Sequence, residues 1–93
     1  MDLKDRLALA RGYAGLSREE LAARAGLAGS DTVAKLEQGT RTRPEYRTVS
    51  ALARALCVDI EWLGSGLGPD PDPAAVRAAV DAARASQAPQ VAA

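Results

Sequence analysis

The sequence GLSREELAARAGLAGSDTVAKLEQG, at residues 15–39, predicts two short amphipathic helices separated by a break that contains glycine. Ser17 and Glu20 have the spacing of a capping box, in which each side chain accepts a hydrogen bond from the other residue's backbone N–H. Gly26 and Gly39 stand where the two helices are expected to end, because glycine readily adopts the left-handed conformation of a helix C-cap. Helices of two or three turns are unstable alone in water, so the rest of the chain must hold this pair in a fixed relation.

Helix-forming composition extends over the first two-thirds of the chain, where alanine, leucine, arginine and glutamate dominate and no strand-like alternation occurs. Helices are expected at 3–11 and at 45–57, on either side of the pair, followed by a short helical turn that Asp59 caps. Cys57 lies beside the apolar stripe of the 45–57 helix and is expected to be a small buried residue. We therefore predict an all-α domain of five helices over residues 1–67.

The composition changes after residue 67, where GPDPDP interrupts the helical sequence and indicates a linker. An alanine-rich stretch follows and can be helical, but Val76 and Val80 are its only larger apolar residues. Asp72 is expected to cap the start of this stretch, with Pro73 at its first helical position. We expect the stretch to build no core and the two aspartates of the linker to be solvated and to bind no cation. Residues 68–93 are therefore predicted to be a linker and a C-terminal tail.

The composition also argues against several kinds of site. The chain has one cysteine and no histidine, which excludes an intrachain disulfide and the usual zinc sites, so no metal or cofactor is expected. No apolar run reaches the length of a membrane span, and acidic residues near the N-terminus argue against a signal peptide, so a cytoplasmic protein is expected. An enzyme is not expected, since no catalytic constellation or glycine-rich phosphate loop is present. Formal net charge is zero, although residues 35–47 carry four basic and two acidic residues.

Two charged residues lie on apolar helix stripes. Arg11 continues the stripe of the 3–11 helix one turn beyond Leu7, and Glu37 lies one turn beyond Val33. A buried unpaired charge costs several kcal/mol, so we expect Arg11 and Glu37 to meet as a hydrogen-bonded ion pair. The alternative is that both side chains extend to water from the helix ends.

The opposite face of the second helix of the pair would then be free. With Glu37 turned inward, Asp31, Lys35 and Gln38 face outward and Thr32 lies on a flank. This outer face is small and polar, and it carries one cation.

An ordered set of short motifs connects these features over residues 3–63. The matched positions are Arg11, Leu16-Ser17-x-Glu19-Glu20-Leu21-Ala22, Gly26, Val33-x-x-Leu36-Glu37-x-Gly39, Pro44, Leu52-Ala53-x-Ala55-Leu56 and Trp62-Leu63. In this order and spacing they resemble the helix-turn-helix domain of the lambda-repressor/Cro family, also called the Xre family. Two departures stand out: Arg18 replaces the glutamine that is common in the family, and the turn after Gly26 has one extra residue, expected within LAGS.

The resemblance implies that residues 30–38 form a recognition helix in the major groove of double-stranded DNA. The implied base-contact residues are Ser30, Asp31, Thr32 and Lys35. The implied contacts to the DNA backbone are Arg18, Thr40, Arg41, Thr42 and Arg43. Two alternatives remain open: Asp31 pairs with Lys35 at the i,i+4 spacing and contacts no base, and the loop at 39–44 is merely solvated.

The end of the domain is rich in apolar residues, which form either core or a dimer surface. The candidate dimer residues are Ile60, Trp62, Leu63 and Leu67. The resemblance implies a transcriptional regulator, most often a repressor, that binds an inverted-repeat operator as a homodimer. The alternative is an antitoxin or a protein-interaction adaptor that keeps the fold with weak or no DNA binding and uses the C-terminal tail to reach a protein partner.

Overall fold

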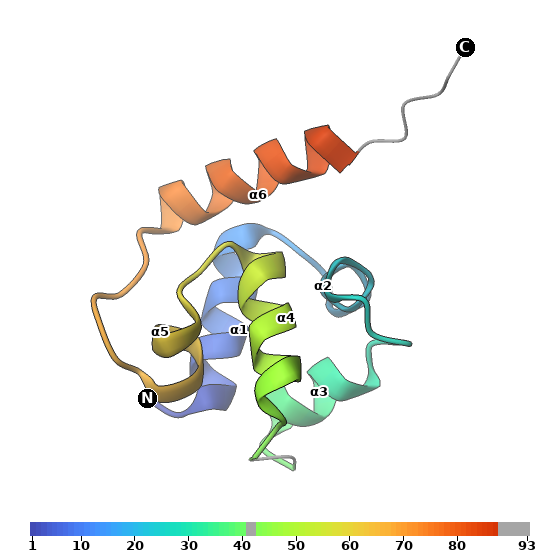
Figure 1. The fold of residues 1–93 in the computed structure, drawn as a ribbon, viewed down its shortest axis with the longest axis vertical. Coiled ribbons are helices and arrows are strands. Elements are labelled where there is room, and N and C mark those ends of the chain that lie inside the picture. Colours follow the sequence, from blue (N-terminus) through green and yellow to red (C-terminus); the bar gives the residue numbers. More distant parts are fainter. Residues whose placement is uncertain (41–42, 88–93) are drawn as a thin grey trace.

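Six α-helices and no strand make up the part of the chain that the computed structural model describes, residues 1–40 and 43–87 (Figure 1). The helices are α1 (Leu3–Ala14), α2 (Arg18–Ala25), α3 (Asp31–Gln38), α4 (Tyr46–Leu56), α5 (Ile60–Ser65) and α6 (Pro73–Gln87). The all-α prediction is confirmed, and residues 1–67 contain five helices. The structure adds a sixth helix, which packs on the others.

The core lies where α1, α2, α3 and α4 face one another, and α5 closes it from the side of α1 and α4. The largest fully buried side chains are Leu7, Leu21, Leu36, Leu52, Leu56, Leu63, Val33 and Val80. Seven of these come from the first five helices, and each lies on the apolar stripe of its own helix. The short helices α2 and α3 are therefore held by burial against α1 and α4.

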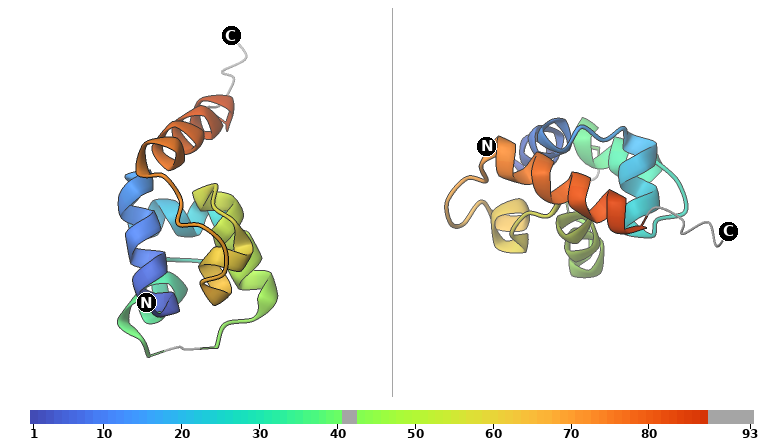
Figure 2. Two further views of the ribbon diagram at one scale, coloured as in Figure 1. Left: turned by 90° about the vertical axis from the view of Figure 1, so that its left-hand side faces the viewer. Right: turned by 90° about the horizontal axis from the view of Figure 1, so that it is seen from above.

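Helix α6 corrects the expectation that the alanine-rich stretch builds no core. Val80 is 0% exposed, Val76 is also buried, and α6 packs mainly against α1. Figure 2 shows α6 lying across the ends of α1 and α4. Two valines one turn apart suffice here because the surrounding alanines let the helix backbone approach α1 closely.

The linker before α6 is docked through Asp70, which was expected to be solvated, whereas Asp72 caps α6 as the sequence predicted. The Trp62 indole Nε1 donates a hydrogen bond to Asp70 Oδ1 at 2.9 Å. The carboxylate of Asp72 accepts from the backbone N–H of Ala75 at 2.9 Å and so caps the start of α6. Both carboxylates thus fix the path of the chain from α5 to α6.

Two residues near helix ends differ from expectation. Cys57 is exposed, not buried, because α4 ends at Leu56 and Cys57 adopts a left-handed conformation at the C-cap, with φ 58°.

Arg6, which no sequence pattern singled out, is buried. Its guanidinium donates to the carbonyls of Leu63 at 2.9 Å and Gly64 at 3.3 Å, and so joins α1 to the end of α5.

Candidate nucleic-acid interface

The α2–α3 pair begins at the capping box that the sequence predicted. The Glu20 N–H donates to Ser17 Oγ at 3.0 Å, and the Ser17 N–H donates to Glu20 Oε1 at 3.1 Å. The backbone N–H of Ser17 lowers the pKa of Glu20 below its ordinary value, helped by the Ser17 hydroxyl and by Arg84 of α6. Gly26, in the left-handed conformation with φ 76°, ends α2. Helix α3 then starts at Asp31, after Ser30 at the N-cap.

An ion cluster fixes α3 against α1 and α2, and it contains the pair expected between Arg11 and Glu37. Arg11 Nε donates to Glu37 Oε2 at 2.6 Å, and Arg11 Nη2 donates to Glu37 Oε1 at 2.9 Å. A third nitrogen, Nη1, donates to the carbonyl of Leu16 at 3.1 Å. The Glu37 side chain is 4% exposed, so this fork of charge-assisted hydrogen bonds is largely shielded from water.

A second arginine joins the same carboxylate. Arg18, the first residue of α2, places Nε 3.3 Å from Glu37 Oε1. Burial by itself raises the pKa of Glu37, but the hydrogen bonds and positive charges of Arg11 and then Arg18 outweigh it. The pKa of Glu37 therefore lies below its ordinary value of 4.5, and the carboxylate is ionised at neutral pH.

The outer face of α3 carries the expected polar residues. Asp31, Lys35 and Gln38 are exposed and Thr32 is half-buried, while Val33 and Leu36 are buried on the opposite face. Lys35 Nζ lies 3.0 Å from Asp31 Oδ2, which is the i,i+4 pair that the sequence left as an alternative. Because both side chains are largely exposed, this pair is weak and can open when another partner is offered.

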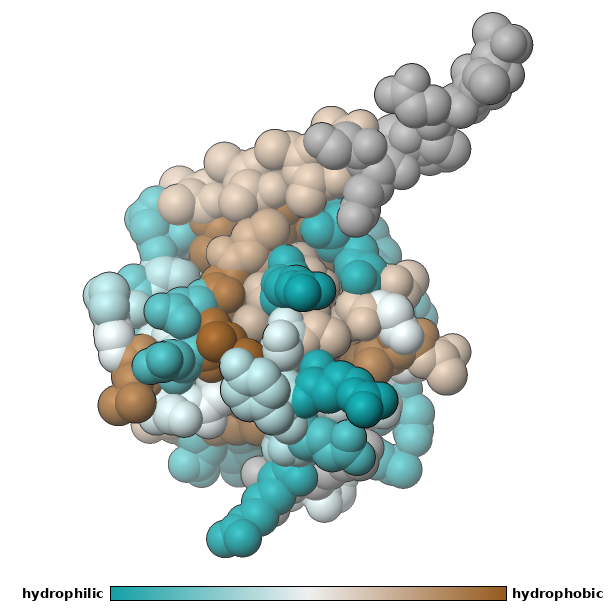
Figure 3. Space-filling model, in the orientation of Figure 1, coloured by the Kyte–Doolittle hydropathy of each residue, from teal (hydrophilic) through white to brown (hydrophobic). Residues whose placement is uncertain are grey.

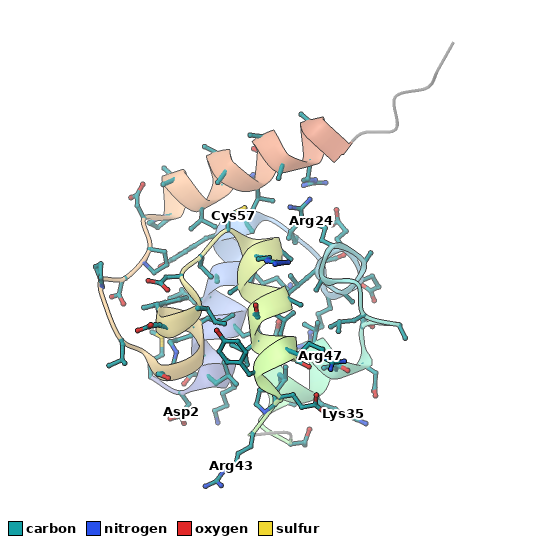
Figure 4. All side chains as sticks on the ribbon, in the orientation of Figure 1. Asp2, Arg24, Lys35, Arg43, Arg47 and Cys57 are labelled. Atoms are coloured by element: carbon teal, nitrogen blue, oxygen red, sulfur yellow. The ribbon has the colours of Figure 1, made fainter. Side chains whose placement is uncertain are left out.

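The segment after α3 gathers basic side chains at the same end of the molecule. Figure 4 shows Lys35, Arg43 and Arg47 around the end of α3 and the start of α4, while Arg24 and Cys57 lie toward α6. Arg43 and Arg47 are exposed. The Thr40 hydroxyl donates to the carbonyl of Lys35 at 3.1 Å, which caps the end of α3. The sequence-predicted contacts Arg41 and Thr42 lie outside the described residues.

Sequence reasoning assigned no contact to two of the cations near α3. The sequence shows Arg47 only as part of a charge run, because it does not give the direction of α4 relative to α3. Lys4, in the first turn of α1, extends over the C-terminal end of α3 at Gly39. Its position depends on packing between helices far apart in sequence, so no local signal could have found it.

The opposite end of the molecule differs in character. In Figure 3 the surface of α6 is weakly hydrophobic, whereas hydrophilic side chains gather around the start of α4. Helix α6 lies at the far end from α3 in Figures 1 and 2, so it leaves the outer face of α3 uncovered. The polar end and the alanine-rich end are therefore separate surfaces.

The structure corrects the predicted dimer surface in two of its four residues. Trp62 is 2% exposed and Leu63 is fully buried, because α5 packs against α4 and α1 and the Trp62 indole is held by Asp70 of the linker. They belong to the core of the protomer. Ile60 is half-buried beside a groove formed with α4, and Leu67, directly after α5, is exposed.

Helices α2 and α3 define a helix-turn-helix unit. Both are short and capped, an ion cluster holds them on the inner side, and α3 has a polar outer face that no other described part of the chain covers. A family model of the helix-turn-helix domain matches residues 2–63, two-thirds of the chain, and the chain belongs to this family. The match agrees with the resemblance to the Xre-like DNA-binding domains. No curated protein and no solved structure matches the chain. Among the described residues, no helix is long and apolar enough to cross a membrane.

Proposed function

We propose that the protein is a sequence-specific transcriptional regulator that acts in the cytoplasm on double-stranded DNA, most simply as a repressor. The observation that carries this proposal is the outer face of α3, which is polar and uncovered while its inner face is held by Val33, Leu36 and Glu37. A helix presented in this way fits the major groove, where polar side chains read base edges.

The base contacts in this proposal come from the start and the outer face of α3. Lys35 donates to guanine O6 or N7 once its pair with Asp31 opens, and Asp31 then accepts from cytosine N4. Thr32 and Ser30, near the helix start, contact base edges or a phosphate. The exposed pair costs little to open, so the intrahelical bridge is compatible with binding.

The backbone contacts come from residues on both sides of α3. We assign them to Arg18, Thr40 and Arg43, to Arg41 and Thr42 outside the described residues, and to Arg47 in the first turn of α4. Contacts of this kind fix the register of the protein on the duplex and carry no sequence information of their own. Although the net charge of the whole chain is zero, the basic residues around Arg43 and Arg47 make the surface where DNA would lie locally positive.

An inverted-repeat operator requires two copies of α3, so we propose a homodimer. The surface available to a second copy includes Ile60 and Leu67, together with the exposed Tyr46 at the start of α4. Sedimentation velocity over a concentration series tests this proposal. A dimer that Leu67→Asp or Ile60→Asp dissociates supports it, and a wild-type chain that stays monomeric also when bound to its operator rejects it.

The experiment for DNA binding is selection of bound duplexes from a random pool, followed by anisotropy titrations on the selected sequence. Lys35→Ala is expected to alter the preferred sequence. Arg43→Ala is expected to weaken binding to all sequences alike. It should also make the slope of log K against log salt less steep by about 0.9. Arg54→Ala removes the same charge near the other end of α4 and serves as the matched control. Failure to enrich any sequence rejects sequence-specific binding.

The second candidate is an antitoxin or interaction adaptor with weak DNA binding. The zero net charge and the acidic Asp31 on the outer face of α3 favour it. The docking of α6 on α1 removes the first part of the C-terminal tail as a free partner-binding arm. Retention of the protein on random DNA at low salt separates the candidates, since an adaptor would flow through.

A further inference from the structure

The ion cluster contains more positive charge than the Glu37 carboxylate needs. Arg11 alone donates to both carboxylate oxygens, at 2.6 and 2.9 Å. Arg18 adds a third and longer contact at 3.3 Å to an oxygen that already has a partner. The three groups together carry one unit of positive charge in excess. Arg18 therefore adds to the stabilisation of Glu37, but it does so through one nitrogen only and keeps further donors that the carboxylate does not use.

The location of Arg18 is also unfavourable for the helix that carries it. It occupies the first position of α2, where the helix dipole favours acidic residues and disfavours a cation. Its side chain is 40% exposed, against 24% for Arg11. Within the described part of the chain, Nε of Arg18 donates to Glu37 and the two terminal nitrogens donate to no other residue, while the side chain is 40% exposed.

We infer that Glu37 is a positioning residue that holds the Nε edge of Arg18, so that the terminal nitrogens of Arg18 form a preoriented fork for one DNA backbone phosphate. This inference rests on the proposed DNA binding and deepens it by linking the phosphate contact to the carboxylate that fixes α3. The guanidinium is planar and offers donors on two edges, so it can serve both anions at once. A lysine ammonium is a single point charge on a flexible stem and cannot keep this geometry.

The pairing with Arg11 makes this arrangement compatible with DNA. An isolated carboxylate near a phosphate would repel it, but the charge of Glu37 is already neutralised by Arg11. The same carboxylate is fixed to α1, so Arg18 is tied through it to the element that also sets the orientation of α3. The phosphate contact and the base-reading face would then move as one unit.

The test compares Arg18→Ala, Arg18→Lys and the control Arg54→Ala in anisotropy titrations on a labelled duplex of mixed sequence at several salt concentrations. Arg18→Ala is expected to bind about tenfold more weakly. Its log K should depend less steeply on log salt, by about 0.9. Arg18→Lys keeps the charge, but its loss in log K is expected to be more than half of the loss caused by Arg18→Ala. The control Arg54→Ala is expected to change the affinity less than twofold.

Each departure from these results has a defined meaning. An Arg18→Lys variant that binds like the wild type shows that an untethered charge suffices and overturns the positioning role of Glu37. An unchanged salt slope in Arg18→Ala overturns the phosphate contact, and an equal loss in Arg54→Ala shows general electrostatics instead. A wild-type chain that binds no duplex rejects the proposed function together with this inference, whereas wild-type binding with unaffected Arg18 variants rejects the inference alone.

Two further measurements distinguish a purely structural role of Arg18 from the proposed contact to phosphate. One is the temperature of unfolding, and the other is the effect of Arg18→Lys in a protein in which Glu37 is also replaced. Because Glu37 keeps Arg11, Arg18→Ala is expected to unfold at the same temperature as Arg54→Ala, and binding is measured well below both midpoints. In a folded Glu37→Met protein, which has no acceptor for Arg18 Nε, the loss of affinity caused by Arg18→Lys should shrink at least threefold. A penalty that stays the same in that background overturns the inference.

Discussion

Replacement of Arg11 by methionine removes the strongest part of the ion cluster and keeps an apolar side chain in place of the aliphatic stem of the arginine. Two charge-assisted hydrogen bonds to Glu37 are lost, at 2.6 and 2.9 Å, and the carbonyl of Leu16 loses its donor at 3.1 Å. Such bonds each contribute about 1.5–3 kcal/mol net. Removing one partner of a buried pair costs about 3–5 kcal/mol, because the other charge stays behind without compensation.

Two features of the structure reduce this loss. Arg18 remains 3.3 Å from the carboxylate and can move closer, and Arg11 is 24% exposed, so water can reach part of the vacated space. We therefore expect the free energy of unfolding to fall by about 2–3 kcal/mol. For a chain of this size the midpoint of thermal unfolding should drop by about 10–20 °C.

Urea unfolding at neutral pH, followed by circular dichroism of the helices, measures this change. Arg54→Ala sets the effect of removing an exposed arginine and should stay within about 0.5 kcal/mol of the wild type. The double variant Arg11→Met with Glu37→Met should be more stable than Arg11→Met alone, because it leaves no buried carboxylate that only the longer contact to Arg18 compensates. A loss below about 1 kcal/mol for Arg11→Met, or a double variant less stable than both single ones, would contradict the reasoning.

The remaining predictions concern pH, the docking of α6 and the linker. Because the pKa of Glu37 in the folded chain lies below its ordinary 4.5, its ionised form stabilises the fold at neutral pH. That contribution is lost as the pH falls through the folded pKa; urea midpoints below pH 4.5 should fall more steeply in the wild type than in Glu37→Met. Val80→Ala should lower the free energy of unfolding by about 2 kcal/mol in urea titrations, whereas a change below about 0.5 kcal/mol would show that α6 is not part of the core. Asp70→Ala removes the acceptor of the Trp62 indole and should lower the free energy of unfolding by about 1–2 kcal/mol. The fluorescence of the single tryptophan should shift to the red. An unchanged spectrum and an unchanged stability would show that the linker is not docked.

Local features of the site followed from the sequence because their physics is local. The capping box of Ser17 and Glu20 depends on residues three apart, and the left-handed glycines depend on backbone sterics. The contact between Arg11 and Glu37 spans 26 positions, yet it was predictable because a charge on an apolar stripe requires a partner and few candidates existed. Helix ends were less certain: α1 continues to Ala14 and not to residue 11.

What the sequence by itself determined is the set of helices, the polar outer face of α3 and the need for an ion pair behind it. The tertiary structure alone decided that Trp62 is core and not interface, that Arg6 reaches carbonyls 57 and 58 positions away, and that Val76 and Val80 bury α6. The physical reason is that helical periodicity and capping are encoded within a few residues. Burial of a sparse apolar pair or of an arginine depends on a surface assembled from distant parts of the chain, and no local pattern describes that surface.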